Sequence, residues 1–476
     1  MVCLRTPVLT LVLLLWSPGA FAGSAQEVVD TWLKRADLQG VSIGVSVRDV
    51  ATGEVLAEHR ADQLMNPASG TKLLTTSAAL LALGPEHRWT TGVSHFSQTL
   101  RLVGGGDPAL LGEGLSSLAV ETAQVMGEQS LETLVVDVSR HDAERVPPAF
   151  DQKSTDASYR PAVGPAGSHY GAFEVTVRPS VKPGEPLKVV VRPGGSAIQV
   201  VNRARTVFER APDTPELAIG TRPGKGGRTR VVVSGALVAG ADPVKTRRRA
   251  PDPDAMTGYL LRDALVARGV KARGARIVVA ADVPPQDGER TLAEHKSAPL
   301  AEIVRDINVW SNNFMAEALM KELAQVSSGA VEGLSWPGGA QVVTEALIGL
   351  GVEGDGIRVV NGSGLYRATH VSAGAMTDLL VRMTGHSSLG KVFRESLGLA
   401  GGEGWLRRRL TGASTKGRVR AKTGTLDEVV SLSGLAPRAG GAEVAFSILV
   451  NDATPARTRK LRRAIDALVS KLVQLP

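Results

Sequence analysis

Ser69 and Lys72 lie three residues apart at the start of an apolar segment, 73–83. That segment is too long for a typical strand and is rich in good helix formers, so we expect a helix there. Residues three positions apart share one face of a helix, which would bring the serine hydroxyl and the lysine amine together. A serine becomes a good nucleophile when a base removes its proton, and a lysine is such a base when burial or nearby charge lowers its pKa. The pair therefore predicts nucleophilic catalysis by Ser69, with Lys72 as its base.

A second candidate segment is Ser311-Asn312-Asn313, the only Ser-x-Asn sequence in the chain. We expect the Ser311 hydroxyl to pass a proton between Lys72 and a leaving amine. Asn313 would hold Lys72 and a substrate amide carbonyl. Taken alone, the same residues are also typical of a helix N-cap, which would need no catalytic role.

A third candidate segment, Lys422-Thr423-Gly424-Thr425, follows a predicted strand. A lysine ammonium and two threonine hydroxyls at a sheet edge make a carboxylate-binding site, and a glycine permits close approach of a substrate backbone. In isolation, the segment is equally typical of a charged strand end followed by a turn.

The three segments are specific only as a set. A second Ser-x-x-Lys sequence, at Ser388 and Lys391, shows that this spacing also arises by chance. Ser-x-x-Lys, a Ser-x-Asn type motif and Lys-Thr-Gly in this order are nevertheless typical of penicillin-binding proteins and class A β-lactamases. Such a set supplies a nucleophile, a base, a proton relay and an anion clamp for acyl transfer. We expect the backbone N–H groups of Ser69 and Thr425 to form the oxyanion hole.

The chain resembles the D-alanyl-D-alanine carboxypeptidase/endopeptidase branch of the low-molecular-mass penicillin-binding proteins, the type with large inserts after the nucleophile helix. The resemblance rests on five segments in the family order: 66–72, 104–108, 311–317, 361–367 and 421–425. It implies a serine peptidase that trims or cleaves peptidoglycan stem peptides and crosslinks through an acyl-enzyme on Ser69, which penicillin inhibits covalently. The balance between trimming and crosslink cleavage stays open.

The fold expected from the residues is α+β, with helices and an antiparallel sheet segregated along the chain. Alternating apolar residues predict a hairpin over 41–59, and three short strands over 418–450 predict an antiparallel meander. An amphipathic helix is expected over 455–472. Between about 90 and 290, short β-like runs separated by Gly and Pro indicate β-rich inserts.

The resemblance gives these segments a domain arrangement. It implies a penicillin-binding/β-lactamase-like catalytic domain, an antiparallel sheet flanked by helices, split between 23–90 and 290–476. Two inserted β-rich domains are expected between the halves, the first over 91–165 and 245–289 and the second over 166–244.

The resemblance also suggests residues that recognise the substrate. In the family, an arginine of the Gly-Ser-Gly-Leu segment and an acid of the first insert recognise the free end of the stem peptide. Arg367 matches the arginine; Asp151 is our candidate for the acid, with Asp156 as its competitor. Asn361, where the family usually has Asp, and 402–406, in place of a usual Asp-Gly-Thr-Leu, are departures that could shift substrate preference.

Residues 1–22 have the pattern of a signal peptide: Arg5, an apolar region over 7–16, and small residues at 20 and 22 before the cleavage point. The alternative is an uncleaved anchor. The single cysteine, Cys3, lies within this segment, so we expect no disulfide, and no later segment is apolar for long enough to span a bilayer. We therefore expect an exported protein of the periplasm or cell envelope.

The composition limits the classes of ligand that we expect the protein to bind. The chain is 43% hydrophobic and 21% charged, as is ordinary for globular proteins, and its formal net charge of +8 is spread over short clusters. We expect peptidoglycan stem peptides and β-lactams as ligands and no nucleic acid. The eight His are scattered, so no metal site and no cofactor are expected.

Two other functions were compatible with the motifs. A β-lactamase shares the chemistry, but no Glu-x-x-x-Asn sequence lies between Ser311 and Lys422, and roughly 240 residues separate Ser69 from Ser311, too many for a compact lactamase. A non-catalytic sensor of wall peptides or β-lactams would be marked by loss of one catalytic residue, and all five are present. Acyl transfer to Ser69 is therefore the favoured hypothesis.

Overall fold

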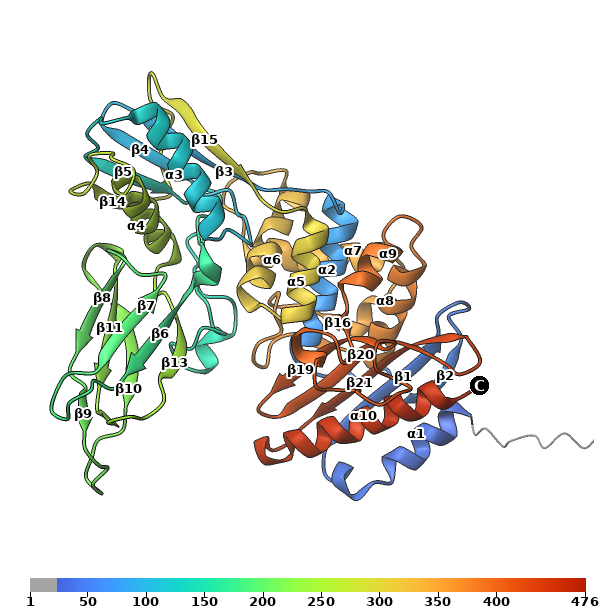
Figure 1. Ribbon diagram of the computed structural model, residues 1–476. Coiled ribbons are helices and arrows are strands. Elements are labelled where there is room, and N and C mark those ends of the chain that lie inside the picture. The colour runs from blue at the N-terminus through green and yellow to red at the C-terminus, as the bar shows by residue number, and fades with distance from the viewer. Residues whose placement is uncertain (1–23) are drawn as a thin grey trace, which may run out of the picture.

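The computed structural model describes residues 24–476 (Figure 1). The predicted signal peptide, 1–22, and Cys3 lie outside the described residues. The part of the chain that the structure describes forms a main domain, built from both chain ends, and two inserts between its halves. No helix in 24–476 combines the length and the apolar character that crossing a membrane requires.

A six-stranded antiparallel sheet is the centre of the main domain, in the order β18-β19-β20-β21-β1-β2. The predicted hairpin is confirmed, because β1 (Ser42–Asp49) pairs with β2 (Val55–His59). The predicted meander is also confirmed, in β19 (Arg420–Leu426), β20 (Val429–Pro437) and β21 (Glu443–Asn451). β1 pairs with β21 as well, so the two ends of the chain meet in one sheet. The short β18 (Gly398–Leu399) completes the sheet beside β19.

Helices cover both faces of this sheet (Figure 1). One face carries α1 (Ala25–Leu33) and α10 (Thr458–Gln474), whose Leu461, Ile465, Leu468 and Leu472 are buried at helical spacing, as the amphipathic pattern predicted. The other face carries a larger group of helices that packs into a second core. Its members are α2 (Thr71–Leu83), α5 (Leu300–Trp310), α6 (Asn313–Ser328), α7 (Trp336–Gly349), α8 (Ala373–Gly385) and α9 (Gly390–Ser396). A two-strand pair, β16 (Ile357–Arg358) and β17 (His370–Val371), lies between α7 and α8 in the chain.

The first insert is a mixed sheet in the order β14-β5-β4-β3-β15, with two helices packed on it. Its elements are β3 (Thr90–Phe96), β4 (Thr99–Val103), α3 (Gly112–Met126), β5 (Thr133–Asp137), α4 (Pro253–Val266), β14 (Arg276–Ala280) and β15 (Arg290–Lys296). The two helices make it an α/β layer and not simply a β-rich domain. The predicted boundary at 290 is also corrected, because β15 pairs with β3 and extends this sheet to Lys296.

The second insert is β-rich, as expected, with three small sheets around one core. The first contains β13 (Val244–Arg249), β6 (Ala172–Arg178) and β7 (Lys188–Arg192), and the second contains β10 (Ala218–Pro223), β11 (Thr229–Ser234) and β8 (Ile198–Asn202). The third pairs β9 (Arg205–Val207) with β12 (Ala236–Val238). Residues 245–249 were assigned to the first insert, but β13 pairs with β6 along its whole length, so they belong here.

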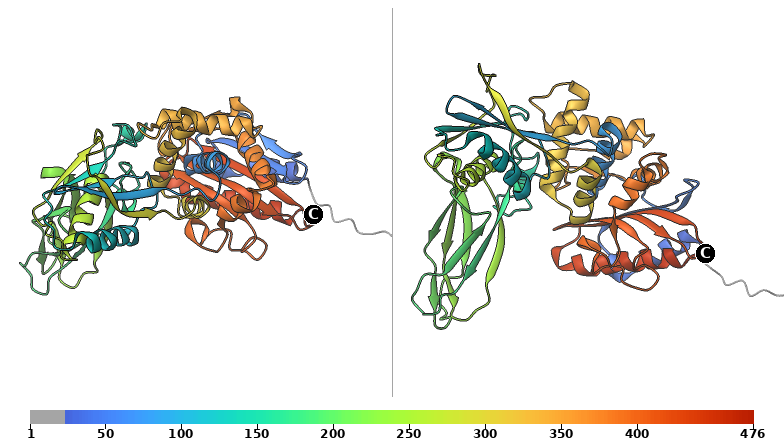
Figure 2. Two further views of the ribbon diagram at one scale, coloured as in Figure 1. Left: turned by 90° about the horizontal axis from the view of Figure 1, so that it is seen from above. Right: turned by 45° about the horizontal axis from the view of Figure 1, so that its top comes forward.

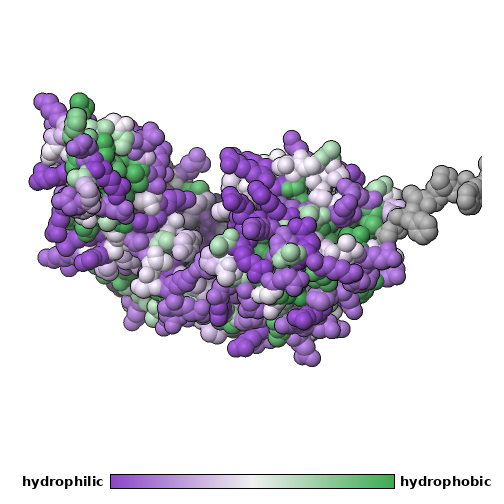
Figure 3. Space-filling model, turned by 90° about the horizontal axis from the view of Figure 1, so that it is seen from below, coloured by the Kyte–Doolittle hydropathy of each residue, from purple (hydrophilic) through white to green (hydrophobic). Residues whose placement is uncertain are grey.

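The two inserts lie on one side of the main domain in every view of the ribbon (Figures 1 and 2). From below, the molecular surface is hollowed between the insert lobe and the main lobe (Figure 3). Helices α5 and α6 of the main domain lie next to the inserts (Figure 1). The candidate residues at the starts of α2 and α6 and on β19 are therefore positioned near the junction of the two lobes.

Candidate active site

Ser69 lies in a single helical turn, Ala68–Gly70, that leads directly into α2. Ala68 has φ of 49°, a left-handed conformation that costs a non-glycine residue energy and that surrounding structure must impose. The turn is held by Asn66, whose Oδ1 accepts from the Ala68 N–H at 2.7 Å and whose Nδ2 donates to the Tyr366 carbonyl. The nucleophile candidate is thus fixed at the buried start of an apolar helix.

Lys72 is fully buried, and its Nζ makes three polar contacts. Nζ lies 3.0 Å from Ser69 Oγ, 2.7 Å from Asn313 Oδ1 and 2.8 Å from the Ser363 carbonyl oxygen. Burial lowers the pKa of Lys72 to about 7, against the opposing effect of the Glu317 carboxylate. A neutral amine has two N–H groups, and Asn313 and Ser363 accept both, so its lone pair is left facing the Ser69 hydroxyl.

The Ser311-Asn312-Asn313 segment is the tight connection between α5 and α6. Ser311 ends α5 with φ of 58°, and the Asn312 side chain caps α6 by accepting from the Met315 N–H. The N-cap interpretation is therefore correct for Asn312, while its two neighbours contact the site. Ser311 Oγ accepts from Lys422 Nζ at 2.8 Å, and Asn313 Nδ2 donates to the Tyr159 carbonyl at 2.6 Å.

Lys422 is buried on β19 and donates both to Ser311 Oγ and, at 3.1 Å, to the Thr423 carbonyl. Burial, and to a lesser degree the charge of Lys72, lower the pKa of Lys422 well below its ordinary value. The five residues predicted to be catalytic thus form two contact groups, Ser69–Lys72–Asn313 and Ser311–Lys422. Ser69, Asn313 and Ser311 line the same cleft.

A glycine is needed at position 424 for a different reason from the one we expected. A Cβ at this position would collide with the Pro67 carbonyl oxygen and with Ser431 Oγ, which itself donates to Pro67 O at 2.7 Å. The glycine is therefore required because the turn that carries Ser69 packs directly against β19. Close approach of the substrate backbone is not needed to explain it.

The outer part of β19 offers donors to an anion. Strand β18 pairs only with Arg420 and Ala421, so the following residues of β19 have no strand partner on that side in the described chain. Thr423 and Thr425 line the cleft there. Arg462 of α10, which the sequence did not single out, donates to Thr425 Oγ1 at 2.9 Å and adds a positive charge to this end. Hydroxyls and a guanidinium at an open strand edge suit a carboxylate.

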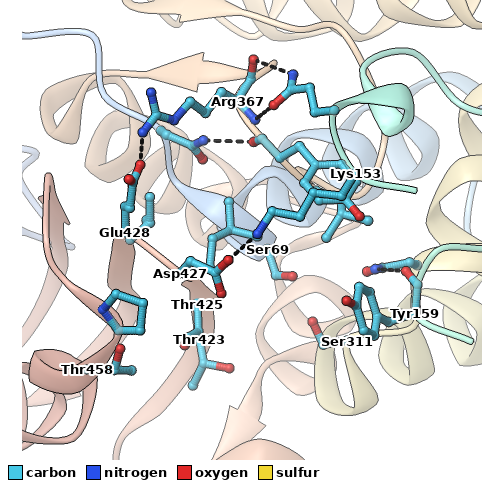
Figure 4. A pocket seen from close by; sticks show the side chains of 18 of the residues that line it. Ser69, Lys153, Tyr159, Ser311, Arg367, Thr423, Thr425, Asp427, Glu428 and Thr458 are labelled. Atoms are coloured by element: carbon cyan, nitrogen blue, oxygen red, sulfur yellow. Dashed lines mark hydrogen bonds and ion pairs between the residues drawn. The ribbon is translucent and has the colours of Figure 1, made fainter. Parts of the chain in front are cut away.

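The structure has a cleft of about 680 Å³, which we call the catalytic cleft; among the residues that line it are Ser69, Ser311, Asn313, Thr423, Thr425 and Arg462. In Figure 4, Ser311 and Tyr159 lie on one side of Ser69, and Arg367, Asp427 and Glu428 lie on the other. The chance match at Ser388 and Lys391 is exposed at the start of α9 and does not line the cleft. In residues 24–476, no group of three or more His, Cys, Asp or Glu side chains is arranged to hold a metal ion.

The rim of the catalytic cleft carries two exposed ion pairs. Arg367 lines the cleft as predicted, but its guanidinium contacts Glu428, and Lys153 contacts Asp427 (Figure 4). Asp427 and Glu428 form the β19–β20 turn, and sequence reasoning could not distinguish them from ordinary solvated turn residues.

The structure does not place either candidate insert acid in the cleft. Asp151 is exposed and does not line it, although its neighbour Gln152 does. Asp156 accepts from the Thr221 N–H at 2.8 Å and pairs with Arg248, which makes it part of the second insert. Asp151 lies in a single 3₁₀ turn, Phe150–Gln152, and Asp156 in a loop, so no periodicity in the sequence showed which side chains face the cleft.

The two departures from the family pattern have different positions. Asn361 is fully buried, donates to the Pro148 and Leu365 carbonyls, and does not line the cleft. A carboxylate could not make those donations, so Asn361 is explained by its loop. Trp405, within the second departure, lines the cleft and is 63% exposed, so that segment does face the substrate side.

Glu317 is a buried residue whose role the sequence reasoning missed. Its carboxylate accepts from the backbone N–H groups of Gly362 and Ser363 at 3.0 and 2.9 Å, and so orients the Ser363 carbonyl that Lys72 contacts. Burial raises the pKa of Glu317, and the two N–H groups and the Lys72 charge oppose that shift. The available signal was an acid flanked by apolar residues at 314–316 and 318–320 of a predicted helix.

Comparisons with known proteins identify the family and the fold. Residues 25–472 match the D-Ala-D-Ala carboxypeptidase 3 (S13) family. A D-alanyl-D-alanine carboxypeptidase of Actinomadura sp. (strain R39) is 35% identical over 470 residues, which cover 94% of this chain and 85% of the relative. The crystal structure of penicillin-binding protein 4 from Haemophilus influenzae has a TM-score of 0.80 at 22% identity, covering 94% of this chain and 99% of that one. The same protein complexed with a β-lactam has a TM-score of 0.74 at 22% identity, covering 93% and 97%.

Proposed function

The chain belongs to the D-Ala-D-Ala carboxypeptidase 3 (S13) family, and from this premise we propose that Ser69 carries the acyl group in the cycle of a serine-type D-Ala-D-Ala carboxypeptidase. The substrate is a peptidoglycan stem peptide that ends in D-Ala-D-Ala. The observation that carries the assignment is the environment of Lys72, a buried amine within 3.0 Å of Ser69 Oγ with its N–H groups accepted elsewhere.

In the proposed cycle, Lys72 takes the hydroxyl proton as Ser69 Oγ attacks the carbonyl of the penultimate D-Ala. The bond from that carbonyl carbon to the nitrogen of the last residue then breaks. Ser311, which contacts Lys422 at 2.8 Å, passes a proton to the departing amine. Water hydrolyses the ester and returns Ser69. The backbone N–H groups of Ser69 and Thr425 are proposed to stabilise the oxyanion in both steps.

The terminal carboxylate of the substrate is proposed to bind at the outer part of β19. Lys422, Thr423 and Thr425 supply the donors, and Arg462 adds charge from α10. Arg367, on the opposite side of Ser69 from Ser311, is proposed to contact the remainder of the stem peptide (Figure 4). An anionic end favours the protonated form of Lys422, which opposes the effect of its burial.

A β-lactam is proposed to acylate Ser69 in place of the peptide. The named complex of penicillin-binding protein 4 from Haemophilus influenzae with a β-lactam supports this for a protein of the same fold. The enzyme is proposed to work in the periplasm or cell envelope, which the signal-peptide pattern of 1–22 supports. Fractionation of cells that produce the full chain checks the location.

Release of D-alanine from a stem-peptide mimic that ends in D-Ala-D-Ala tests the proposed function. We expect release by the wild-type protein and no detectable release by Ser69→Ala. Ser388→Ala is the matched control, because Ser388 has the same local Ser-x-x-Lys spacing but lies exposed outside the cleft. Release that survives Ser69→Ala would refute the assignment of the nucleophile.

A further inference from the structure

The fold gathers the excess positive charge of the chain in the second insert. Residues 172–249, from β6 to β13, contain fifteen Lys and Arg against six Asp and Glu, an excess of nine positive charges. The formal net charge of the whole chain is +8, so the rest of the chain is close to neutral. Like charges repel one another, so this imbalance does not help the insert to fold. It is typical of a surface that attracts anions.

The cations of the second insert are concentrated on one face of one sheet. In the β13-β6-β7 sheet (Figure 1), the odd-numbered residues of β6 from Phe173 to Val177 lie in the core, so the even-numbered residues line the outer face. Cross-strand pairing places two residues of β7 and two of β13 on the same face. We call this surface the basic face, and its cations are Arg178, Lys188, Arg192, Lys245 and Arg247.

The cations of the basic face are not neutralised by acids. All five are exposed, and none forms an ion pair within residues 24–476; the ion pairs of this insert join other side chains. Glu174 is the one acid among the described residues of this face, and it accepts from the Thr176 hydroxyl at 3.1 Å. From strand geometry, each cation lies within about 10 Å of another, which is close to the Debye length in physiological salt. An anion at this face therefore interacts with several cations at once.

The basic face extends into the hollow between the two lobes (Figure 3). Its residue Arg247 lines a second hollow of about 500 Å³, together with Asp306 and Trp310 of α5 in the main domain. The other cations follow from there toward the far end of β6. A narrow chain can follow this face in between the lobes, whereas a bilayer is flat over such a distance and cannot enter. The shape therefore favours a linear anion over a membrane surface.

We propose that the basic face binds a linear polyanion with a phosphodiester in each repeat, at a surface separate from the catalytic cleft. Three of the five cations are arginines, and a guanidinium can donate two N–H groups to one phosphate. A phosphodiester is ionised at any pH near neutrality, and its repeating charge suits cations that recur at intervals of about 7 Å along a strand. No bond is made or broken at this face, so the proposal adds a binding site and leaves the proposed cycle unchanged.

The other large sheet of the same insert supplies a matched control. Arg222 lies opposite Arg230 across β10 and β11, as Arg178 lies opposite Lys188 across β6 and β7. Lys225 is a third exposed cation, in the turn between β10 and β11. Replacing these three residues of the β10–β11 hairpin removes as much charge from the same domain as replacing three residues of the basic face.

The test measures binding of a synthetic poly(glycerol phosphate) chain to the wild-type protein and to two triple variants by titration calorimetry. Anionic phospholipid vesicles and polyglutamate of matched length are the competing ligands. None of the replaced residues lines the catalytic cleft, so D-alanine release should stay within about twofold of wild type in both variants and reports that they fold. The basic-face variant combines Arg178→Gln, Lys188→Gln and Lys245→Gln, and the control variant combines Arg222→Gln, Lys225→Gln and Arg230→Gln.

We expect the basic-face variant to bind poly(glycerol phosphate) about tenfold more weakly than wild type, and the control variant to lose less than about threefold. Wild-type binding should weaken steeply with added salt. Equal losses in the two triple variants would show that net charge alone attracts the polymer and would overturn the basic face. Tighter wild-type binding to vesicles or to polyglutamate would overturn the choice of ligand.

A smaller pair of variants serves if the basic-face variant fails to fold. Lys188→Gln with Lys245→Gln must then weaken binding by more than Lys225→Gln with Arg230→Gln. The proposal is also independent of catalysis, because Ser69→Ala should bind the polymer as tightly as wild type does. Wild-type protein that releases D-alanine but does not bind the polymer refutes the basic face and leaves the proposed function standing.

Discussion

The inner end of the catalytic cleft and its rim are both made of charged side chains, but the two differ in how those charges are held. Lys72 and Lys422 are buried, and each contacts at least two acceptors: Lys72 contacts Asn313 and Ser363, and Lys422 contacts Ser311 and its neighbour Thr423. The rim cations Arg367 and Lys153 are 70% and 54% exposed, and each contacts a single acid. Cations at the inner end are thus fixed in position and have shifted pKa values, whereas cations at the rim are solvated.

The difference follows from the cost of removing charge from water. A buried ammonium is tolerated only where hydrogen-bond acceptors replace its hydration, which fixes its position and shifts its pKa. An exposed pair is screened by solvent and loses side-chain freedom when it forms, so it contributes little. Substitutions at the inner end should therefore have large effects on chemistry, and substitutions at the rim should have small ones.

The largest effect is expected for Lys72→Ala. Removing the base should lower the rate of acylation by about 10²- to 10⁴-fold, which is the usual contribution of general acid–base catalysis. In the wild-type protein, kcat/KM should rise with pH as Lys72, whose pKa burial lowers to about 7, loses its proton. Stopped-flow acylation measured across pH checks both. If kcat/KM of Lys72→Ala still rises with pH as it does in the wild-type protein, the proposed role of this amine is contradicted.

A large loss of stability is expected for Glu322→Gln, at the buried junction of the main domain with the first insert. Glu322 accepts from Arg140 Nε at 2.9 Å, from Trp89 Nε1 at 2.9 Å, and contacts His141 Nε2 at 2.7 Å. Removing one member of a buried charged cluster leaves its partners uncompensated and should cost about 3 kcal/mol of unfolding free energy. Urea denaturation measures this.

The matched control is Glu345→Gln on the exposed side of α7, where the loss should stay within about 0.5 kcal/mol. Equal losses of unfolding free energy in the two variants would show that burial does not determine how much a charged side chain contributes to stability. The comparison between buried and exposed sites would then fail.

A smaller effect on rate, with a diagnostic pH dependence, is expected for Glu317→Gln. The carboxylate raises the pKa of Lys72, so its removal should move the acidic limb of kcat/KM to lower pH. It should also lower the plateau by about tenfold, because the Ser363 carbonyl loses its fixed orientation. The control is Thr75→Val, which removes a 2.9 Å hydrogen bond to the Gly362 carbonyl of the same loop without changing charge. An acidic limb that moves equally in both variants would indicate loosening of the loop alone.

The smallest effect is expected for Lys153→Ala on the rim. Loss of its exposed contact to Asp427 should change kcat/KM for D-alanine release by less than about twofold and should leave the thermal unfolding midpoint in place. Steady-state release assays and thermal denaturation check this. A tenfold change would place Lys153 among the residues that bind substrate and would erase the distinction between rim and inner end.

The sequence was sufficient for the residues whose contacts are local or whose motifs are fixed. Ser69 and Lys72 share one face at the start of α2, and the β19–β21 meander and β1–β2 hairpin followed from alternation. The partners contributed by distant segments could not be predicted in this way. Ser363 is 291 residues from Lys72, and the contact depends on how Glu317 orients a loop that has no periodic pattern.

Prediction of the inserts from the sequence was limited in the same way. Strand β15 was assigned to the main domain because nothing local indicates that it pairs with β3, about 200 residues earlier. Asp151 was chosen as the acid facing the substrate, but the loop around it has no regular pattern that would show its direction. Trp405 was noticed only as a departure from a motif, and its exposure beside Ser311 required the fold.

The central claim is that Ser69 forms a covalent acyl-enzyme, and intact-mass measurement after treatment with benzylpenicillin tests it most directly. The account predicts one stable adduct per chain, mapped by peptide digestion to the segment that contains Ser69, present in Ser388→Ala and absent in Ser69→Ala. An adduct that persists in Ser69→Ala, or penicillin that is turned over without a stable adduct, would contradict it.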